Sequence, residues 1–193
     1  MTNPKCVLLL SGKRKCGKDF VAERILKRLD PESAVIIRLS DPIKSHWALS
    51  KGLELDQLRG TSEYKEKYRK DMTKWGEEKR LVDSGCFCRA AIEMSKAEEK
   101  SVWIISDARR MTDLQWFQSH HGGVLQTVRI IANDSARIER GWIFTEGIDD
   151  AETECGLDSV TNWDWTIENN GSENDLDDKI NLILNQINNQ VSS

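Results

Sequence analysis

The stretch that decides the fold runs from Lys5 to Asp19 and reads Lys-Cys-Val-Leu-Leu-Leu-Ser-Gly-Lys-Arg-Lys-Cys-Gly-Lys-Asp. Its first part, residues 5–11, contains an unbroken apolar run, which is typical of a strand buried on both faces in a parallel sheet. Gly12 and Gly17 follow with four residues between them, and a lysine comes directly after the second glycine. This spacing predicts a loop that wraps phosphate groups between a strand and a helix.

The predicted loop carries several groups that bind anions. Glycine permits the backbone geometry that points successive N–H groups toward one phosphate, and the following helix adds partial positive charge at its N-terminus. We expect Lys18 to reach the β- and γ-phosphates of ATP, with further charge from the other basic residues of the loop. The candidate ATP-binding residues here are Gly12, Lys13, Arg14, Lys15, Cys16, Gly17, Lys18 and Asp19.

Two aspartates are candidate ligands of Mg²⁺. Asp19 stands where such loops usually carry a serine or threonine that binds the metal. Because a carboxylate is also a hard oxygen ligand, Asp19 either binds the metal, directly or through water, or caps the helix. Asp107 ends the apolar segment 102–107, as the metal-binding aspartate of a Walker B strand does. Its alternative role is an ordinary turn at the end of a strand.

The rest of the chain alternates between strand and helix patterns. Residues 34–39, 102–106, 124–132 and 163–167 predict four more strands, and helical patterns cover 42–52, 54–60, 64–82, 87–97 and 175–191. Asn133 can cap a short helix that runs to Arg140. We therefore expect an α/β, three-layer P-loop NTPase fold with a five-stranded parallel sheet. Residues 141–162 show no periodicity.

We expect one domain over residues 1–193. Its core comprises about 1–40 and 99–193, a helical substrate-binding insertion covers about 41–98, and a short lid covers about 133–145. The formal net charge is −4, although residues 13–18 and 65–70 are basic. Local positive charge in an acidic protein favours a small anionic ligand over nucleic acid.

Composition also bears on the location of the protein. No apolar run approaches the length of a membrane-spanning helix. The chain has five cysteines, an odd number without the spacing of a disulfide framework or a zinc site. We therefore expect reduced thiols, a cytosolic protein and no membrane partner.

Beyond the loop, further segments in the same order resemble the animal-type phosphomevalonate kinase family. They are residues 64–72, 75–80, 106–110, 140–144, 149–157 and 167–169, so that the likeness runs from about residue 5 to 190. The resemblance implies a nucleoside-monophosphate-kinase-like fold. It also implies ATP-dependent conversion of (R)-5-phosphomevalonate to (R)-5-diphosphomevalonate with Mg²⁺, a step of the mevalonate route to isoprenoids and sterols.

The same resemblance implies roles for individual residues. The catalytic set it implies is Lys15, Lys18, Arg110 and Arg140. The substrate-binding set is Lys44, Lys65, Arg69, Arg80, Arg89, Arg109, Arg110 and Asn169. Arg137 and Arg140 belong to the lid over ATP, and Asn170 joins the ATP-binding set.

Elementary chemistry agrees with a phosphate acceptor. A phosphate monoester is already ionised near pH 7, since its second pKa is about 6. No general base is then required, but fixed cations must offset the repulsion between two polyanions, and arginine binds phosphate through two parallel hydrogen bonds. Arg109 and Arg110 follow the third predicted strand, at the sheet edge where ligands bind.

Several alternatives remain open at this stage. A nucleoside or deoxynucleoside monophosphate kinase shares the loop, lid and acceptor chemistry, and a P-loop regulator would bind nucleotide without phosphoryl transfer. The basic row Lys65, Arg69 and Arg80 is either a phosphate-binding set or a solvated helix face. We interpret Tyr64, Tyr68 and Trp75 as packing residues. The acidic residues 149–154 suggest a mobile loop, with a metal site as the alternative, and we expect a monomer.

Overall fold

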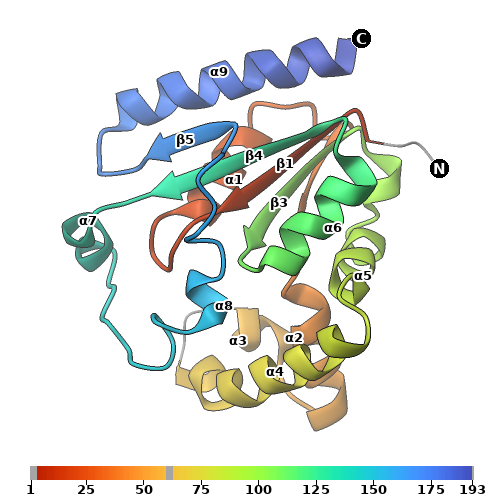
Figure 1. Cartoon of the computed structure of the whole chain (residues 1–193), viewed down its shortest axis with the longest axis vertical. Helices are drawn as coiled ribbons and strands as arrows, with labels where there is room; N and C mark the ends of the chain where they lie inside the picture. The colour runs from red at the N-terminus through yellow and green to blue at the C-terminus, as the bar shows by residue number, and fades with distance from the viewer. Residues whose placement is uncertain (1–3, 60–62, 193) are drawn as a thin grey trace.

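The computed structural model describes residues 4–59 and 63–192. Within them, five strands form one sheet in the order β2-β3-β1-β4-β5, and every adjacent pair is parallel (Figure 1). The strands are β1 (Cys6–Ser11), β2 (Ala34–Ile37), β3 (Val102–Ala108), β4 (Leu125–Ile131) and β5 (Trp165–Glu168). The expected α/β fold with a five-stranded parallel sheet is confirmed.

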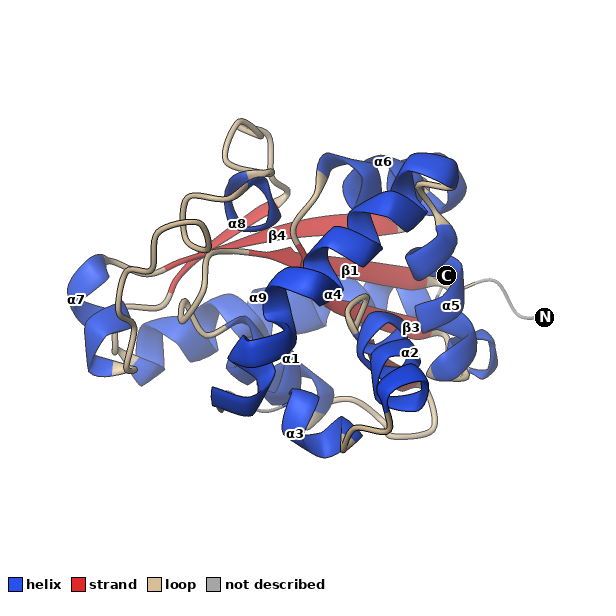
Figure 2. Ribbon diagram, turned by 90° about the horizontal axis from the view of Figure 1, so that it is seen from below, coloured by secondary structure: helices blue, strands red, loops and turns tan. Residues whose placement is uncertain are grey.

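Helices cover both faces of the sheet, as Figure 2 shows from below. Helices α1 (Lys18–Leu26) and α9 (Glu173–Ser192) pack on one face, and α5 (Cys86–Met94) and α6 (Met111–His121) on the other. Alternate residues of β1 enter the two cores: Leu8 and Leu10 face α1 and α9, whereas Val7 and Leu9 face the opposite side. Burial on both faces explains why β1 is apolar throughout.

The segment between β2 and β3 is almost entirely helical. It contains α2 (Asp41–Lys51), α3 (Leu55–Arg59), α4 (Glu63–Val82), α5 and a short 3₁₀ turn at Ala97–Glu99. Aromatic side chains of α4 pack within this segment: Tyr64 contacts Tyr68 of the same helix edge-on with ring centroids 5.4 Å apart, both lie against a small buried cluster, and Trp75 stacks on His46 of α2 at 4.2 Å. The interpretation of the aromatic stripe as packing is confirmed.

The sequence patterns missed two helices and the end of one strand. No pattern predicted α6, whose buried side chains are only Asp113, Leu114 and Phe117 and therefore leave a weak apolar periodicity. The short helix α8 (Glu152–Cys155) was not predicted either, and it lies in the segment without periodicity. In addition, β3 continues through Asp107 to Ala108, so that this aspartate lies inside the strand.

One irregularity shapes the edge of the sheet that carries the loop. β1 and β3 pair Leu9 with Ile105, but the next pair is Ser11 with Ala108, so that β3 holds one extra residue in this bulge. The carboxyl ends of β1 and β3 lie side by side beyond it. The phosphate loop after Ser11 therefore meets the residues that follow Ala108.

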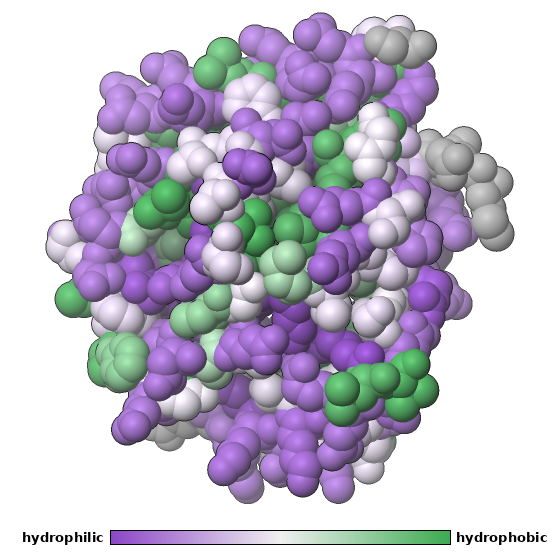
Figure 3. All heavy atoms as spheres, in the orientation of Figure 1, coloured by the Kyte–Doolittle hydropathy of each residue, from purple (hydrophilic) through white to green (hydrophobic). Residues whose placement is uncertain are grey.

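One face of the molecule is largely hydrophilic. In the orientation of Figure 3, hydrophilic residues make up most of the visible face, and a recess with hydrophilic walls lies between the sheet and helices α2–α4. No helix in the described part of the chain is long and apolar enough to cross a membrane. All five cysteines are free thiols.

Candidate active site

The loop between β1 and α1 has the close contacts that only glycine allows. Gly17 has φ +92°, and a Cβ atom there would lie 2.3 Å from Nδ2 of Asn169. At Gly12 (φ +157°), a Cβ would lie 2.4 Å from the carbonyl oxygen of Ile130. Lys15 also has a positive φ of 64°, an unusual value for a residue with a side chain. The backbone is thus wound tightly around one point at the start of α1.

Lys18 turns back into this loop. Its side chain is buried, and Nζ donates to the carbonyl oxygen of Gly12 and, at 3.1 Å, to that of Lys13. Burial lowers the pKa of Lys18, because desolvation disfavours the charged form. Two backbone carbonyls therefore hold the ammonium group where an anion in the loop would meet it.

The short helix α7 (Asp134–Glu139) brings two arginines onto the loop. Asn133 caps it as expected, since its side-chain oxygen accepts from the N–H of Ala136 at 2.8 Å. Arg137 donates through Nε to the carbonyl of Arg14 at 3.0 Å. Arg140 donates through Nη1 to the carbonyls of Lys15 and Cys16, at 3.4 and 3.3 Å. Both arginines expected over ATP thus contact the phosphate loop.

Asn169 contacts the phosphate loop and does not border the larger cavity, so that its expected contact with the acceptor stays a prediction. Its Nδ2 donates to the carbonyl of Cys16 at 2.9 Å, and its own carbonyl accepts from Nη2 of Arg140 at 2.7 Å. It also borders a cavity of about 330 Å³ together with Gly17, Phe20, Arg140, Gly171 and Leu176. Asn170 is exposed and accepts from the N–H of Asn133 at 2.8 Å, at the base of α7.

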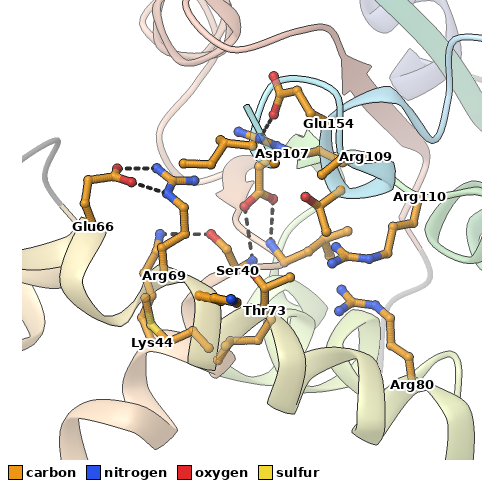
Figure 4. A pocket seen from close by; sticks show the side chains of 18 of the residues that line it. Ser40, Lys44, Glu66, Arg69, Thr73, Arg80, Asp107, Arg109, Arg110 and Glu154 are labelled. Atoms are coloured by element: carbon orange, nitrogen blue, oxygen red, sulfur yellow. Dashed lines mark hydrogen bonds and ion pairs between the residues drawn. The ribbon is translucent and has the colours of Figure 1, made fainter. Parts of the chain in front are cut away.

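A larger cavity of about 510 Å³ lies between helices α2 and α4 and the end of β3, and cations border it together with several carboxylates (Figure 4). The basic residues around it are Lys44, Arg69, Lys70, Arg80, Arg109 and Arg110. They come from α2, α4 and the end of β3, far apart in sequence. Arg69 is paired with Glu66 at 2.6 Å, and Lys44 donates to the hydroxyl of Ser40 at 2.9 Å. The cavity suits a ligand with more than one negative charge.

Arg80 has unsatisfied hydrogen-bonding capacity at this cavity. It is 7% exposed, its guanidinium lies 4.6 Å from the ring centre of Phe87, and Nη2 lies 3.6 Å from Asp113. Nε and Nη1 are buried without a hydrogen-bond partner among the described residues. Burial lowers the pKa of Arg80, and the nearby charge of Arg110 lowers it further. Two guanidinium groups that face each other in this way favour an anion between them (Figure 4).

The two candidate metal ligands have different surroundings. Asp107 borders the larger cavity, and its carboxylate accepts from the N–H groups of Leu39 at 2.7 Å and Ser40 at 3.1 Å. Asp19 is exposed in the first turn of α1. Among residues 4–59 and 63–192, no group of three or more His, Cys, Asp or Glu side chains could hold a metal ion. The alternative of a metal site in the acidic segment 149–154 is therefore not supported.

Three other expected residues lie apart from these cavities or outside the description. Arg89 was expected to bind the acceptor, but its side chain is 55% exposed on α5, pairs with Asp83 and does not border the larger cavity. Lys13 pairs with Asp158 at 2.9 Å beside the loop. The side chain of Lys65 lies outside the described residues, although its backbone belongs to α4.

Two acidic residues of the site were not expected from the sequence. Asp149 is buried and accepts from the guanidinium of Arg14 and from Nε1 of Trp142, the latter at 2.9 Å. Glu154 is buried too and accepts from Arg109 and from the backbone N–H of Arg14. The expected mobile acidic loop is thus wrong for these two side chains, because the loop arginine and the sheet-edge arginine hold them in place.

Solved structures of low sequence identity share the architecture. A Thermus thermophilus protein, TT1252, aligns with a TM-score of 0.54 at 17% identity, covering 96% of this chain and 98% of its own. Shikimate kinase from Bacteroides thetaiotaomicron aligns with a TM-score of 0.50 at 12% identity, covering 95% of this chain and 98% of its own. At these identities the likeness establishes the fold alone.

Sequence comparison identifies the family. A family model described as phosphomevalonate kinase matches residues 10–123. A curated relative, the phosphomevalonate kinase of Drosophila melanogaster, is 42% identical over 183 residues, which cover 94% of this chain and 96% of the relative. The matched segment contains the phosphate loop and all six basic residues that border the larger cavity. The chain belongs to the phosphomevalonate kinase family.

Proposed function

We propose that this protein transfers the terminal phosphoryl group of ATP to (R)-5-phosphomevalonate, which yields ADP and (R)-5-diphosphomevalonate in the mevalonate route to isoprenoids and sterols. Family membership supports the reaction. The observation that carries the proposal is the pair of cavities near one phosphate loop: the smaller is bordered by Gly17 of the loop, and the larger is bordered by six basic side chains and by Glu154, which accepts from the N–H of Arg14 in the loop. Such an arrangement brings a nucleotide and a second anion to the same point.

The walls of the larger cavity suit the acceptor in polarity as well as charge. Leu39, Ile43, Met72 and Ile148 border it between the basic groups. Phosphomevalonate carries a phosphate and a carboxylate at its two ends and a methyl-bearing carbon between them. Cations would bind the ends, whereas the apolar side chains would contact the middle.

Basic side chains of this protein would neutralise the charge of the two phosphate groups and hold them in position for transfer. Lys18 would exchange its two backbone carbonyl partners for phosphate oxygens of ATP, and Lys15 and Arg140 would contact the same group from the loop and from α7. Arg109 and Arg110 would hold the acceptor phosphate in line. Because the acceptor oxygen is already ionised near pH 7, these cations offset repulsion and no side chain has to remove a proton.

The donors present fit Mg²⁺ that is bound chiefly by the nucleotide. Mg²⁺ in such sites keeps several waters and takes one or two carboxylates together with substrate phosphates. Asp19, exposed one residue after Lys18, would hold it, and Asp107 would do so through water, since both its oxygens already accept backbone N–H groups. When bound, the ion would neutralise charge on the phosphates.

Motion and location complete the proposal. Residues 41–98 would act as a helical substrate-binding insertion and residues 133–145 as a lid, within a single domain whose core is 1–40 and 99–193. Closure of the lid would exclude water from the phosphates. We propose a monomer in the cytosol, where five free thiols stay reduced.

Acceptor specificity tests the function directly. ADP release, coupled to a spectrophotometric reaction, should depend on phosphomevalonate and be at least about a hundred-fold slower with nucleoside or deoxynucleoside monophosphates, as expected when buried cations match only one ligand. A preference for any nucleoside monophosphate would contradict the proposal and favour a nucleotide kinase. ATP binding without consumption of any acceptor would favour a non-catalytic regulator.

A further inference from the structure

One carboxylate joins the phosphate loop to the acceptor cavity. Glu154, on the short helix α8, is 5% exposed and borders the larger cavity. One of its oxygens accepts from the backbone N–H of Arg14, within the phosphate loop. The other accepts from Nη1 of Arg109 at the end of β3, as Figure 4 shows. A single buried anion thus lies between the two halves of the site.

In the proposed function, both partners of Glu154 are groups that bind phosphate. Loop N–H groups after a first strand point at the phosphates of a bound nucleotide, and an arginine at the neighbouring strand end is placed for the acceptor. A carboxylate resembles a phosphoryl group in its negative charge and in its oxygens, which only accept hydrogen bonds. Glu154 therefore holds an N–H group and a guanidinium group that the proposed function assigns to the two phosphates.

The charges of Arg109 and Glu154 also affect Lys18 of the phosphate loop. Besides burial, the charges of Arg109 and Glu154 act in opposite directions on the pKa of Lys18, so all three side chains lie within electrostatic reach of each other. In the absence of an anionic ligand, the Glu154 carboxylate balances two positive side chains at the mouth of the loop. A bound polyphosphate would bring its own negative charge to the same place, and the two anions would repel each other.

We propose that the Glu154 carboxylate occupies the position of the transferring phosphoryl group as long as no nucleotide is bound. Binding of the nucleotide then displaces this carboxylate from Arg109 and from the loop. The proposal rests on the proposed function in one respect, namely that the loop receives the phosphates of ATP. Glu154 stabilises the empty site by pairing with Arg109 and the loop, and it weakens the binding of free phosphate-type anions by competing with them. A ligand then binds in the loop only if its other contacts offset the free energy of displacing Glu154.

The test uses the whole chain of 193 residues and inorganic pyrophosphate as the probe. In Glu154→Gln, the amide retains the size and an oxygen acceptor but loses the charge. Isothermal titration calorimetry should give a pyrophosphate Kd about ten-fold lower than that of the wild type, the order expected when one like charge is removed from a partly screened site. The matched control is Glu152→Gln, on an exposed residue of the same helix, which should leave the Kd unchanged.

A role in positioning alone predicts the opposite result. If Glu154 only held Arg109 and the loop in place, the variant would bind pyrophosphate equally or less tightly, and either result would overturn the proposal. A crystal structure of the wild type with pyrophosphate provides a measurement that does not depend on the variant. The Glu154 carboxylate should have left both the Arg14 N–H and Arg109, and retention of both contacts would overturn the proposal.

Failure of this inference is distinguishable from failure of the proposed function. Pyrophosphate binding requires no acceptor, whereas the proposed function is measured by acceptor-dependent ADP release. A protein that phosphorylates phosphomevalonate but shows no tighter pyrophosphate binding in Glu154→Gln contradicts only the role of Glu154. The reverse pattern contradicts only the choice of acceptor.

Discussion

Arg14 of the phosphate loop binds both carboxylate oxygens of Asp149, with Nη2 at 2.7 Å and Nε at 3.1 Å. The two residues are 135 positions apart in sequence. Asp149 also accepts from Nε1 of Trp142 at 2.9 Å and from the N–H of Thr145 at 2.8 Å. This carboxylate therefore fastens the segment that follows α7 to the loop.

Removal of the Asp149 charge should weaken both stability and ATP binding. Asp149→Asn should lower the free energy of unfolding by about 3 kcal/mol at pH 7, the cost of leaving one partner of a buried pair uncompensated. The KM for ATP should rise, because Arg14 and the residues after α7 lose their shared anchor. Urea denaturation and steady-state kinetics measure the two effects, and Asp178→Asn, on an exposed residue of α9, is the control.

The same carboxylate should make stability depend on pH. Burial by itself would raise the pKa of Asp149, but hydrogen bonds from Trp142 and Thr145 and the charge of Arg14 outweigh it and hold the pKa below its usual range. Stabilisation is then fully present above the unfolded value of about 3.9 and is lost as pH falls toward the folded value. Between pH 6 and the acid limit of folding, the Asp149→Asn variant should lose less stability than the wild type. Parallel curves for the two proteins would contradict this account.

Lys18→Met should abolish most turnover while the fold is retained. Loss of a cation that stabilises the transferring phosphoryl group costs roughly 10³ or more in kcat. The coupled assay measures the loss, and far-ultraviolet circular dichroism and thermal unfolding verify the fold. Lys27→Met, an exposed lysine just after the same helix, should leave kcat unchanged. Turnover near that of the wild type in Lys18→Met would remove this residue from the reaction.

The two arginines Arg110 and Arg89 should behave differently, although both were expected to bind the acceptor. Arg110 borders the larger cavity, whereas Arg89 is exposed and paired with Asp83. Arg110→Gln should lower kcat/KM for phosphomevalonate by about 10³, as expected for a lost charge-assisted contact to phosphate in the transition state. Arg89→Gln should change it less than about two-fold, as surface substitutions do. Equal losses in the two variants would contradict this division.

A methyl group at Gly17 should disturb nucleotide binding. The positive φ and the contact of 2.3 Å with Asn169 both oppose a side chain there, and each such strain costs about 1–3 kcal/mol. Gly17→Ala should raise the KM for ATP at least about ten-fold, because a loss of about 1.4 kcal/mol in binding corresponds to a ten-fold change in affinity. Gly123→Ala, where a Cβ meets nothing within 4 Å, should leave it unchanged. Combination with Asn169→Ala should restore part of the loss if the clash rather than the backbone dominates.

Local patterns in the chain were sufficient to predict most of the sheet and the phosphate loop. The apolar run before Gly12 and the glycine spacing belong to one short stretch, and the Asn133 cap depends on residues three positions apart. Such signals are carried by neighbours in sequence. The helix α6 escaped prediction because only a few of its side chains are buried and one of these is an aspartate.

The parts of the site that could not be predicted depend on distant contacts. Asp149 and Glu154 lie in an acidic stretch without periodicity, and only the folded chain brings them to Arg14 and Arg109. Arg80 and Arg89 are both helical arginines. Packing against Phe87 and Asp113 buries the former, whereas the latter reaches solvent, so composition and spacing do not distinguish them.

The bulge between β1 and β3 sets a limit on how the length of the chain can vary. Because successive side chains of a strand point to opposite faces, a shift of one residue exchanges the two faces. Deletion of either Ser106 or Asp107 would remove the extra residue opposite Leu10 and restore regular pairing. Arg109 and Arg110 would then be displaced by one residue relative to the phosphate loop. Homologous enzymes that keep both arginines should therefore tolerate insertions and deletions in the turns at the opposite edge of the sheet. They should not tolerate them within the bulge at residues 106–107.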